Sequence, residues 1–248
     1  GIAGIVSNNS SLVQQQKLQL MANALQHRGP DGEGFFINEQ QQVGFAHRRL
    51  SVIDLSNNAA QPMHYLGRYT ITYNGEIYNY LELKLTLQQK GYKFKSASDT
   101  EVILAAYDCY QYQCLQYFDG MFAFAIFDYE RNEMVLARDR MGKKPLYIAQ
   151  ASGTLLFASE LKAILQHPSF KSELNLNALN QYLTFQFCLE EKTLFKGIYK
   201  LLPANYFYLN VTQLGGGLPE CTQYWSLNYN VDTHHTEDYF IDTLKFLF

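Results

Sequence analysis

The chain has 248 residues, of which 47% are hydrophobic and 17% are charged, and its 20 basic and 23 acidic residues give a formal net charge of −3. This composition is typical of a globular protein. It excludes a dedicated nucleic-acid binder, because affinity for phosphates needs clustered Lys and Arg. The one dense basic stretch, 138–144, is expected to be a solvated turn. The longest purely apolar run, 121–127, is far shorter than the roughly 20 residues that cross a bilayer, so we expect no membrane span.

The start of the chain and its cysteines indicate a reduced, cytoplasmic protein. Residues 1–6 are apolar but have no basic flank, and polar residues follow at once, so they do not resemble a secretory signal. The cysteines are too few and too scattered for a disulfide scaffold, and they lack the histidine or second pair that a zinc site needs. We therefore predict free thiols and no metal site. The cysteines are Cys109, Cys114, Cys188 and Cys221.

The first half of the chain predicts mixed strands and helices. An apolar run at 1–6 predicts a buried strand, and apolar residues spaced by three and four predict a helix over 17–28. Two stretches of strand-like composition, 44–54 and 68–78, follow. Two capping-box pairs then predict helix starts, and these pairs are Asn79 with Glu82 and Ser98 with Glu101.

The second half begins with strands alone. Four runs at intervals of about ten residues predict an antiparallel meander, namely 121–127, 134–139, 146–150 and 155–159. Helices near 160–166 and 176–187 and strands near 198–202 and 206–209 are predicted after it. Because strands come in adjacent runs with helices grouped between them, the order favours an α+β fold with antiparallel sheets over a doubly wound fold.

The last forty or so residues differ in character from the rest. A glycine run and a proline within 211–231 predict a linker, and 236–248 predicts an amphipathic helix in which the sequence stops. A free end that offers three apolar residues to water is unfavourable, so we expect a fragment of a longer polypeptide. The predicted organisation is a domain over 1–210, a linker over 211–231 and the start of a second domain at 232–248.

The pair Asn74-Gly75 has two interpretations. Asn-Gly between alternating strands is a strong hairpin signal. Against a hairpin, Glu76 to Tyr78 lead directly to the predicted helix cap at Asn79, which leaves little room for a returning strand. In the second interpretation, the bare backbone N–H of Gly75 and the side-chain amide of Asn74 stabilise a tetrahedral oxyanion.

Two charged positions have similar alternatives. Arg49 forms either a salt bridge at the rim of a site or a planar fork for a substrate carboxylate. Asp99 either complements a helix dipole or receives a ligand ammonium. His27-Arg28-Gly29-Pro30-Asp31-Gly32 is compatible with a simple turn after a helix.

Seven motifs occur in one order along the chain. They are 1–6 (Gly-Ile-Ala-Gly-Ile-Val), 27–32 (His-Arg-Gly-Pro-Asp-Gly), 47–54 (His-Arg-Arg-Leu-Ser-Val-Ile-Asp), 74–79 (Asn-Gly-Glu-Ile-Tyr-Asn), 98–101 (Ser-Asp-Thr-Glu), 120–125 (Gly-Met-Phe-Ala-Phe-Ala) and 138–142 (Arg-Asp-Arg-Met-Gly). In this order, residues 1 to about 210 resemble the glutaminase domain of glutamine-hydrolysing asparagine synthetases, a class II glutamine amidotransferase. Sugar-phosphate and phosphoribosyl amidotransferases usually carry other residues where Pro30 and Asp31 stand, so the synthetase branch is preferred.

The resemblance implies a fold and a set of site residues. The fold is that of the N-terminal-nucleophile hydrolases, a four-layer αββα sandwich of two antiparallel sheets. Arg49 would bind the α-carboxylate of glutamine, Asp99 with Glu76 nearby would hold its α-ammonium, and Asn74 with Gly75 would form the oxyanion hole. Backbone around Leu50, Val52 and Ile53 would line the same pocket.

The sequence departs from the family at Gly1, because family members have a nucleophilic cysteine immediately before the matching glycine. In that chemistry the thiol attacks the glutamine amide, and the α-amine of the same cysteine, with a pKa of about 7.7 to 8.0, serves as base. None of the internal cysteines has a free α-amine. Either a residue before Gly1 belongs to the protein and is not shown, which we favour, or the chain is a noncatalytic glutamine-binding or structural module.

The resemblance also implies partners beyond these residues. Ammonia would pass to a C-terminal synthetase domain of the same polypeptide, which would use ATP and Mg²⁺ to adenylate aspartate and form asparagine. The fragment itself needs no cofactor, since the pyrophosphate-binding loop of that domain is absent from it. Amidotransferases of other pathways share this front domain, so another acceptor stays open, and we allow for a homodimer.

Overall fold

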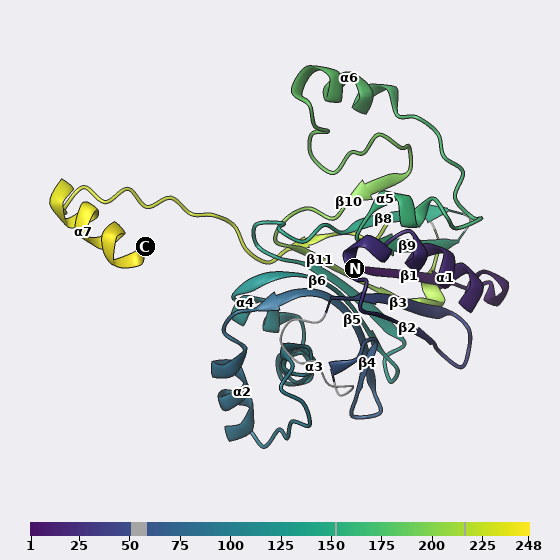
Figure 1. Cartoon of the computed structure of the whole chain (residues 1–248), viewed down its shortest axis with the longest axis horizontal. Coiled ribbons are helices and arrows are strands. Elements are labelled where there is room, and N and C mark those ends of the chain that lie inside the picture. Colours follow the sequence, from purple (N-terminus) through teal and green to yellow (C-terminus); the bar gives the residue numbers. More distant parts are fainter. Residues whose placement is uncertain (51–58, 152, 216) are drawn as a thin grey trace.

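The computed structural model describes residues 1–50, 59–151, 153–215 and 217–248. Within these residues, two antiparallel sheets lie face to face (Figure 1). The first sheet has the order β10 (Ile198–Lys200), β8 (Tyr147–Ala151), β9 (Thr154–Ala158), β1 (Ile2–Ser7), β3 (Val43–Arg49) and β2 (Gly32–Ile37). The second has the order β12 (Thr222–Gln223), β11 (Asn205–Asn210), β7 (Glu133–Arg138), β6 (Gly120–Asp128), β5 (Tyr69–Ile77) and β4 (Met63–Tyr65).

Helices cover the outer face of each sheet. The first sheet packs on α1 (Gln15–Asn23) and α5 (Leu161–Ile164), and the second packs on α2 (Tyr80–Gln89), α3 (Asp99–Tyr110) and α4 (Cys114–Tyr117). A third apolar cluster fills the space between the sheets. The four layers confirm the predicted αββα sandwich and its α+β class (Figure 1). Short 3₁₀ turns lie at Ser10–Leu12, Gln26–Arg28, Gln111–Gln113 and Val211–Gln213.

Burial on both faces explains the continuous apolar run of β1. Ile2 and Val6 point into the cluster between the sheets, whereas Ala3 and Ile5 point into the cluster under α1 and α5. Alternate residues of a strand face opposite sides, so a strand buried on both sides is apolar throughout. This alternation also fixes which way neighbouring positions of β1 point.

The predicted four-strand meander over 121–159 is wrong in one respect. β6 pairs with β7 and β8 pairs with β9, but the two hairpins belong to different sheets. Alternation and turn spacing predict which strands are antiparallel neighbours, and they do not say where the chain changes sheets. The change occurs in the connection 139–146 between β7 and β8.

Local capping also differs from prediction at two helix ends. Asn79 precedes α2 but does not cap it, because its side chain bonds the carbonyl of Tyr117 at 2.9 Å and the N–H of Asp119 at 3.0 Å. The helix predicted over 17–28 ends at Asn23, and a separate 3₁₀ turn follows. At Ser98 half of the predicted capping box is present, since its hydroxyl accepts from the N–H of Thr100 at 3.1 Å, whereas Glu101 accepts from the N–H groups of Lys95 and Ser96.

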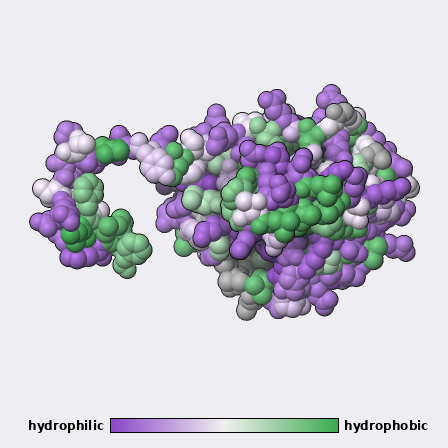
Figure 2. Space-filling view, turned by 90° about the horizontal axis from the view of Figure 1, so that it is seen from above, coloured by the Kyte–Doolittle hydropathy of each residue, from purple (hydrophilic) through white to green (hydrophobic). Residues whose placement is uncertain are grey.

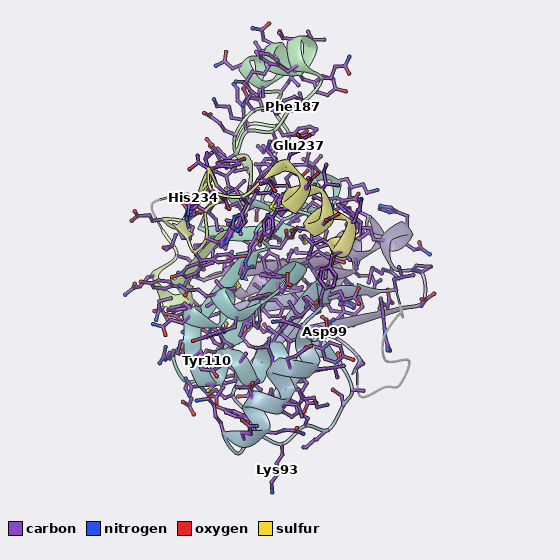
Figure 3. All side chains as sticks on the ribbon, turned by 90° about the vertical axis from the view of Figure 1, so that its left-hand side faces the viewer. Lys93, Asp99, Tyr110, Phe187, His234 and Glu237 are labelled. Carbon is purple, nitrogen blue, oxygen red and sulfur yellow. The ribbon has the colours of Figure 1, made fainter. Side chains whose placement is uncertain are left out.

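Two helices stand away from the sandwich. α6 (Leu176–Phe185) projects above the first sheet, and α7 (Glu237–Leu247) lies at the end of an extended segment (Figure 1). Figure 3 shows Phe187, close after α6, near the top of the view, well above Asp99 and Tyr110, which mark the two ends of α3. Within the predicted linker 211–231, β12 pairs with β11 and Val211 is buried. No helix of the described residues is long and apolar enough to cross a membrane.

Candidate active site

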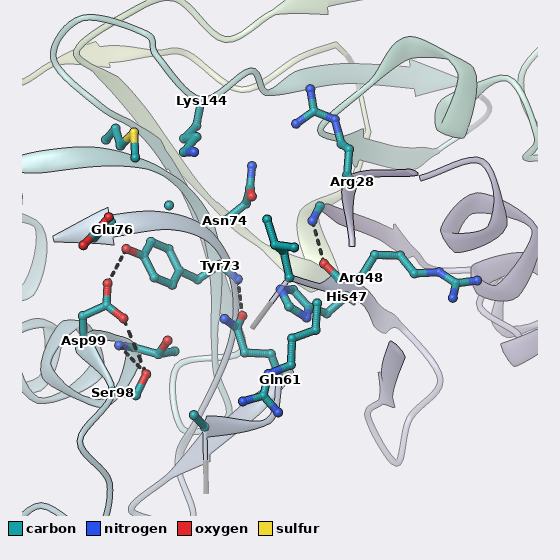
Figure 4. A pocket seen from close by; sticks show the side chains of 17 residues that line it. Arg28, His47, Arg48, Gln61, Tyr73, Asn74, Glu76, Ser98, Asp99 and Lys144 are labelled. Carbon is teal, nitrogen blue, oxygen red and sulfur yellow. Dashed lines mark hydrogen bonds between the residues drawn. The ribbon is translucent and has the colours of Figure 1, made fainter. Parts of the chain in front are cut away.

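A pocket of about 480 Å³ opens where β1, β3, β5 and the start of α3 meet (Figure 4). Most of the predicted site residues line it, and these are Arg49, Leu50, Asn74, Gly75, Glu76 and Asp99. The other two predicted residues, Val52 and Ile53, lie outside the described residues. The structure therefore brings together side chains that are up to 50 positions apart in the sequence.

Gly1 forms one wall of the pocket and is held as a strand residue. Its nitrogen donates to the carbonyl of Arg48 at 2.7 Å, and the N–H of Arg48 donates back to the carbonyl of Gly1 at 2.7 Å. Burial, together with the positive charges of Arg28 and Lys144, lowers the pKa of the Gly1 amino group to about 5. Since the bond to Arg48 uses a single N–H, a peptide N–H at Gly1 would make it equally well.

Asn74 and Gly75 lie inside β5, so the hairpin interpretation is wrong. Asn74 shares a strand face with Thr72, whose hydroxyl donates to the carbonyl of Ala46 across the two sheets at 3.4 Å. The side-chain nitrogen of Asn74 is buried and has no hydrogen-bond partner among the described residues. A buried donor without a partner costs stability, and a ligand acceptor would satisfy it.

Gly75 is required by the close approach of β6. A Cβ at this position would lie 2.1 Å from the carbonyl oxygen of Met121, which is far inside van der Waals contact. Gly75 lines the pocket with its backbone alone.

Asp99 is buried at the first turn of α3, after the Ser98 cap. Its Oδ2 accepts from the hydroxyl of Tyr73 at 2.7 Å and from the N–H of Ile77 at 3.0 Å (Figure 4). Burial raises the pKa of Asp99, and the hydrogen bond from Tyr73 opposes this shift. Glu76 lines the same side of the pocket, so two carboxylates are available to a cation there.

The two adjacent arginines of β3 point to opposite sides of the first sheet. Arg48 extends toward α1, where it pairs with Glu33 at 2.9 Å and donates to Asn23 at 2.7 Å. Both arginines contribute to the pocket lining, although the guanidinium of Arg48 is engaged on the α1 side. Arg48 therefore forms a salt bridge on the α1 side, and the binding of a substrate carboxylate by Arg49 stays a prediction.

The 27–32 motif forms a turn that also reaches the pocket. Gly29 packs against the backbone of Arg48, since a Cβ there would lie 2.4 Å from the Arg48 carbonyl oxygen. Arg28 lines the pocket and pairs with Glu160, which His27 also contacts at 2.7 Å. These bonds hold the pKa of Glu160 at about 2, below its usual range, although burial acts in the opposite direction.

Several pocket residues were not predicted as site residues, and among them are His47, Gln61, Tyr73 and Lys144. His47 is buried, and its Nδ1 has no partner among the described residues. Gln61 accepts from the N–H of Tyr73 through Oε1 at 2.6 Å and so extends the hydrogen bonding of β5 beyond β4. His47 belongs to the recognised motif 47–54 and Tyr73 precedes the motif 74–79, whereas no local pattern marks Gln61.

Taken together, the pocket can hold a zwitterion. Arg49 offers a planar fork to a carboxylate, and Asp99 and Glu76 offer negative charge to an ammonium. Asn74 and Gly75 offer N–H donors to a carbonyl oxygen near Gly1. No cluster of three or more His, Cys, Asp or Glu suited to a metal ion occurs among the described residues.

Comparison with known proteins decides the family. The model of the glutamine amidotransferase domain family matches residues 1–225. This chain belongs to that family. It is 36% identical, over 98% of its length, to asparagine synthetase [glutamine-hydrolyzing] 3 of Bacillus subtilis, of which it covers 39%. It is 42% identical, over 78% of its length, to asparagine synthetase [glutamine-hydrolyzing] 1 of the same organism, of which it covers 30%.

A solved structure agrees with the fold of this glutamine amidotransferase domain. The glutamine phosphoribosylpyrophosphate amidotransferase of B. subtilis matches with a TM-score of 0.63 and 20% identity, over 92% of this chain and 50% of the other. At that identity the match speaks for the fold alone, and it supports the predicted N-terminal-nucleophile hydrolase architecture. The chain spans 30 to 39% of the length of the two asparagine synthetases to which it is similar.

Proposed function

We propose that this domain hydrolyses glutamine to glutamate and ammonia with a cysteine immediately before Gly1 as nucleophile. The observation that carries the proposal is the gathering of Arg49, Asp99 and the Asn74–Gly75 pair around the start of β1. A guanidinium and a carboxylate suit the α-carboxylate and α-ammonium of a free amino acid. The donor pair suits the oxyanion that forms when a side-chain amide is attacked.

The alternation of β1 supports the position of the nucleophile. Ile2 points into the space between the sheets, and a Cβ on Gly1 would point the other way, toward Arg28 and Leu25. A residue before Gly1 would therefore place its side chain on the same face as Ile2. Asn74 faces this space from the second sheet. A thiol at that position would thus face the oxyanion donors.

The proposed chemistry proceeds in two steps through a thioester. The thiol sulfur adds to the side-chain carbonyl carbon of glutamine while its proton passes to the α-amine of the same cysteine, and the oxygen becomes an oxyanion between Asn74 and Gly75. Collapse breaks the C–N bond, and the α-ammonium returns the proton so that ammonia leaves. Water then adds to the thioester, and cleavage of the C–S bond yields glutamate and the free thiol.

The α-amine is suited to this role by its surroundings. Burial and the positive charges of Arg28 and Lys144 lower the pKa of the amino group of Gly1. The α-amine of a cysteine before Gly1 would lie one residue away and close to the same two charges. An amine with a lowered pKa is unprotonated at neutral pH and can accept the proton of the thiol.

Three matched polypeptides test the proposal. The first has Cys as its first residue before Gly1, the second has Ser there, and the third has the same Cys preceded by one more residue, which blocks the α-amine. We expect glutamate release from the first, and at least 10²-fold less from the other two. Equal rates for all three, or no glutamate from the first, would contradict the proposal.

We further propose that the domain supplies ammonia to a synthetase domain of the same polypeptide, which uses ATP and Mg²⁺ to convert aspartate to asparagine. The two asparagine synthetases similar to this chain are much longer than it is. Apolar residues exposed on α6 and α7 also suit burial against another domain, and Figure 2 shows this apolar surface from above. Such an enzyme would work in the cytoplasm, and a homodimer is compatible with it. Asparagine formation from glutamine, aspartate and MgATP by the full polypeptide tests this assignment.

One alternative rests on the sequence at Gly1. If the encoded protein has no cysteine before Gly1, the same pocket would bind glutamine without hydrolysing it. N-terminal sequencing and intact mass of the encoded protein separate these cases. An acceptor other than aspartate is the second alternative, and replacing aspartate by other acceptors in the same assay tests it.

A further inference from the structure

The connection between β7 and β8, where the chain changes sheets, is organised by a buried carboxylate. Asp139 is fully buried, and its two oxygens accept from the backbone N–H groups of Met141 at 3.1 Å, Lys143 at 2.9 Å and Lys144 at 2.9 Å. The expected solvated turn is thus limited to Met141 and Lys143, which are exposed. The remainder of the connection has a fixed shape.

Arg138 completes this frame from the other side. Its guanidinium donates to the carbonyl of Lys144 at 2.8 Å and to that of Gly142 at 2.6 Å. Both backbone polar groups of Lys144 are therefore bonded, and Pro145 after it favours an extended backbone. The two neighbouring lysines point differently, because Lys143 is exposed whereas Lys144 is half-buried and lines the pocket with Gly1 and Asn74.

The other charged and titratable groups that face the pocket from the surrounding elements have assigned partners or roles. Arg28 is compensated by Glu160. Arg49 and the carboxylates Asp99 and Glu76 would pair with the charged ends of glutamine, and His47 is buried below them. Lys144 forms no ion pair with the described residues, and its positive charge contributes to the lowered pKa of the Gly1 amino group. Figure 4 shows Lys144 on the Asn74 side of the pocket, away from Ser98 and Asp99.

We propose that Lys144 is a positioning residue for glutamine hydrolysis, which acts through the nucleophile at the start of β1. Its fixed ammonium charge favours the thiolate over the thiol, keeps the α-amine unprotonated, and stabilises the oxyanion at Asn74 and Gly75. No bond to Lys144 forms or breaks. The inference rests on the proposed glutaminase function and adds a residue that the binding of glutamine does not require.

The role follows from the sign of the charges involved. A nearby positive charge favours the charged form of an acid and the neutral form of a base, so it lowers the pKa of both the thiol and the amine. The half-buried position of Lys144 matters here, because solvent and salt screen exposed charges much more strongly. The exposed Lys143 should therefore have little influence on the same groups.

The test is the pH profile of glutaminase kcat/KM for Lys144→Met in the full polypeptide with its N-terminal cysteine. We expect the acidic limb to move to higher pH by about 0.5 to 1 unit, with roughly a 10-fold loss at pH 6.5 and a smaller loss at pH 9. KM for glutamine should change less than about two-fold, because Arg49 and Asp99 are unaltered. Lys144→Arg should restore the acidic limb, and Lys143→Met should leave the profile unchanged.

Two outcomes would overturn the inference in distinguishable ways. If the parent polypeptide is active and Lys144→Met has the same pH profile, the role of Lys144 is wrong and the glutaminase function stands. If the parent polypeptide releases no glutamate, the proposed function fails and this inference fails with it. Lys144→Gln, which keeps a polar side chain, replaces Lys144→Met if that variant is poorly folded, and thermal unfolding of each variant identifies this case.

Discussion

The hydroxyl of Tyr73 donates a hydrogen bond to Oδ2 of Asp99 over 2.7 Å. Tyr73 belongs to β5 and Asp99 begins α3, so this bond ties the helix that carries the carboxylate to the strand that carries Asn74 and Gly75. Burial raises the pKa of Asp99, and this hydrogen bond counteracts the rise. Tyr73 therefore helps to keep the carboxylate both oriented and ionised, as the binding of an ammonium requires.

Replacing Tyr73 by Phe should weaken glutamine binding without abolishing the reaction. Hydrogen bonds to charged groups contribute about 1.5 to 3 kcal/mol, so we expect KM to rise roughly 10-fold and kcat to change little. Without the hydroxyl the pKa of Asp99 rises further, and the carboxylate is then neutralised as the pH falls. The increase in KM should consequently be larger at pH 6 than at pH 8, as steady-state kinetics at both values would show.

Tyr69→Phe is the matched control. Tyr69 lies four residues earlier on the same face of β5 and donates its hydroxyl hydrogen to Asp108 at 2.8 Å, but it does not line the pocket. Tyr69→Phe should lower the stability toward urea about as much as Tyr73→Phe does, and it should leave KM for glutamine unchanged. A KM that rises equally in both variants would show that the effect is a general loosening of β5.

The adjacent arginines offer a second comparison. Arg49→Ala should raise KM for glutamine by roughly 10- to 100-fold, because it removes a charged hydrogen-bond donor for the α-carboxylate. Arg49→Lys should recover part of this loss, since it keeps the charge and loses the fork. Arg48→Lys, which alters the contacts with Glu33 and Asn23 on the other face, should affect unfolding by urea and not KM. Normal glutamine kinetics in Arg49→Ala would refute the carboxylate assignment.

Asn74→Ala should separate catalysis from stability. The loss of one oxyanion donor typically costs 10²- to 10³-fold in kcat, while KM stays nearly constant because the interaction forms mainly in the transition state. The buried amide nitrogen has no partner among the described residues, so its removal breaks no native bond of that donor. Urea unfolding should therefore show little loss of stability. A fall in kcat below 10-fold would contradict the oxyanion role.

The sequence predicted most strands and the site motifs, because both depend on short-range pattern. β5 is an example, since alternation of apolar residues placed its limits within one residue of Tyr69–Ile77. The change of sheets at 139–146 was not predictable, because it depends on bonds of Asp139 and Arg138 to the backbone of distant residues, namely Phe122 and Leu201. Gln61 and Lys144 were missed for the same reason: their contacts with the pocket join segments that only tertiary structure brings together.

The stability of the fold should depend on pH through His47. Burial lowers the pKa of His47 to about 3, whereas an unfolded histidine titrates near 6.5. Below pH 6.5 the unfolded chain therefore binds a proton that the folded chain does not, and the free energy of unfolding falls with decreasing pH by up to about 1.4 kcal/mol per pH unit for this residue. Urea unfolding of the parent and of His47→Gln at pH 5, 5.5, 6 and 6.5 gives the slope of the free energy of unfolding against pH for each protein. Effects common to both proteins, including the burial of His64 and His167, cancel when the two slopes are compared. We expect a shallower slope in His47→Gln whatever its absolute stability, and equal slopes would show that His47 is protonated in the folded protein.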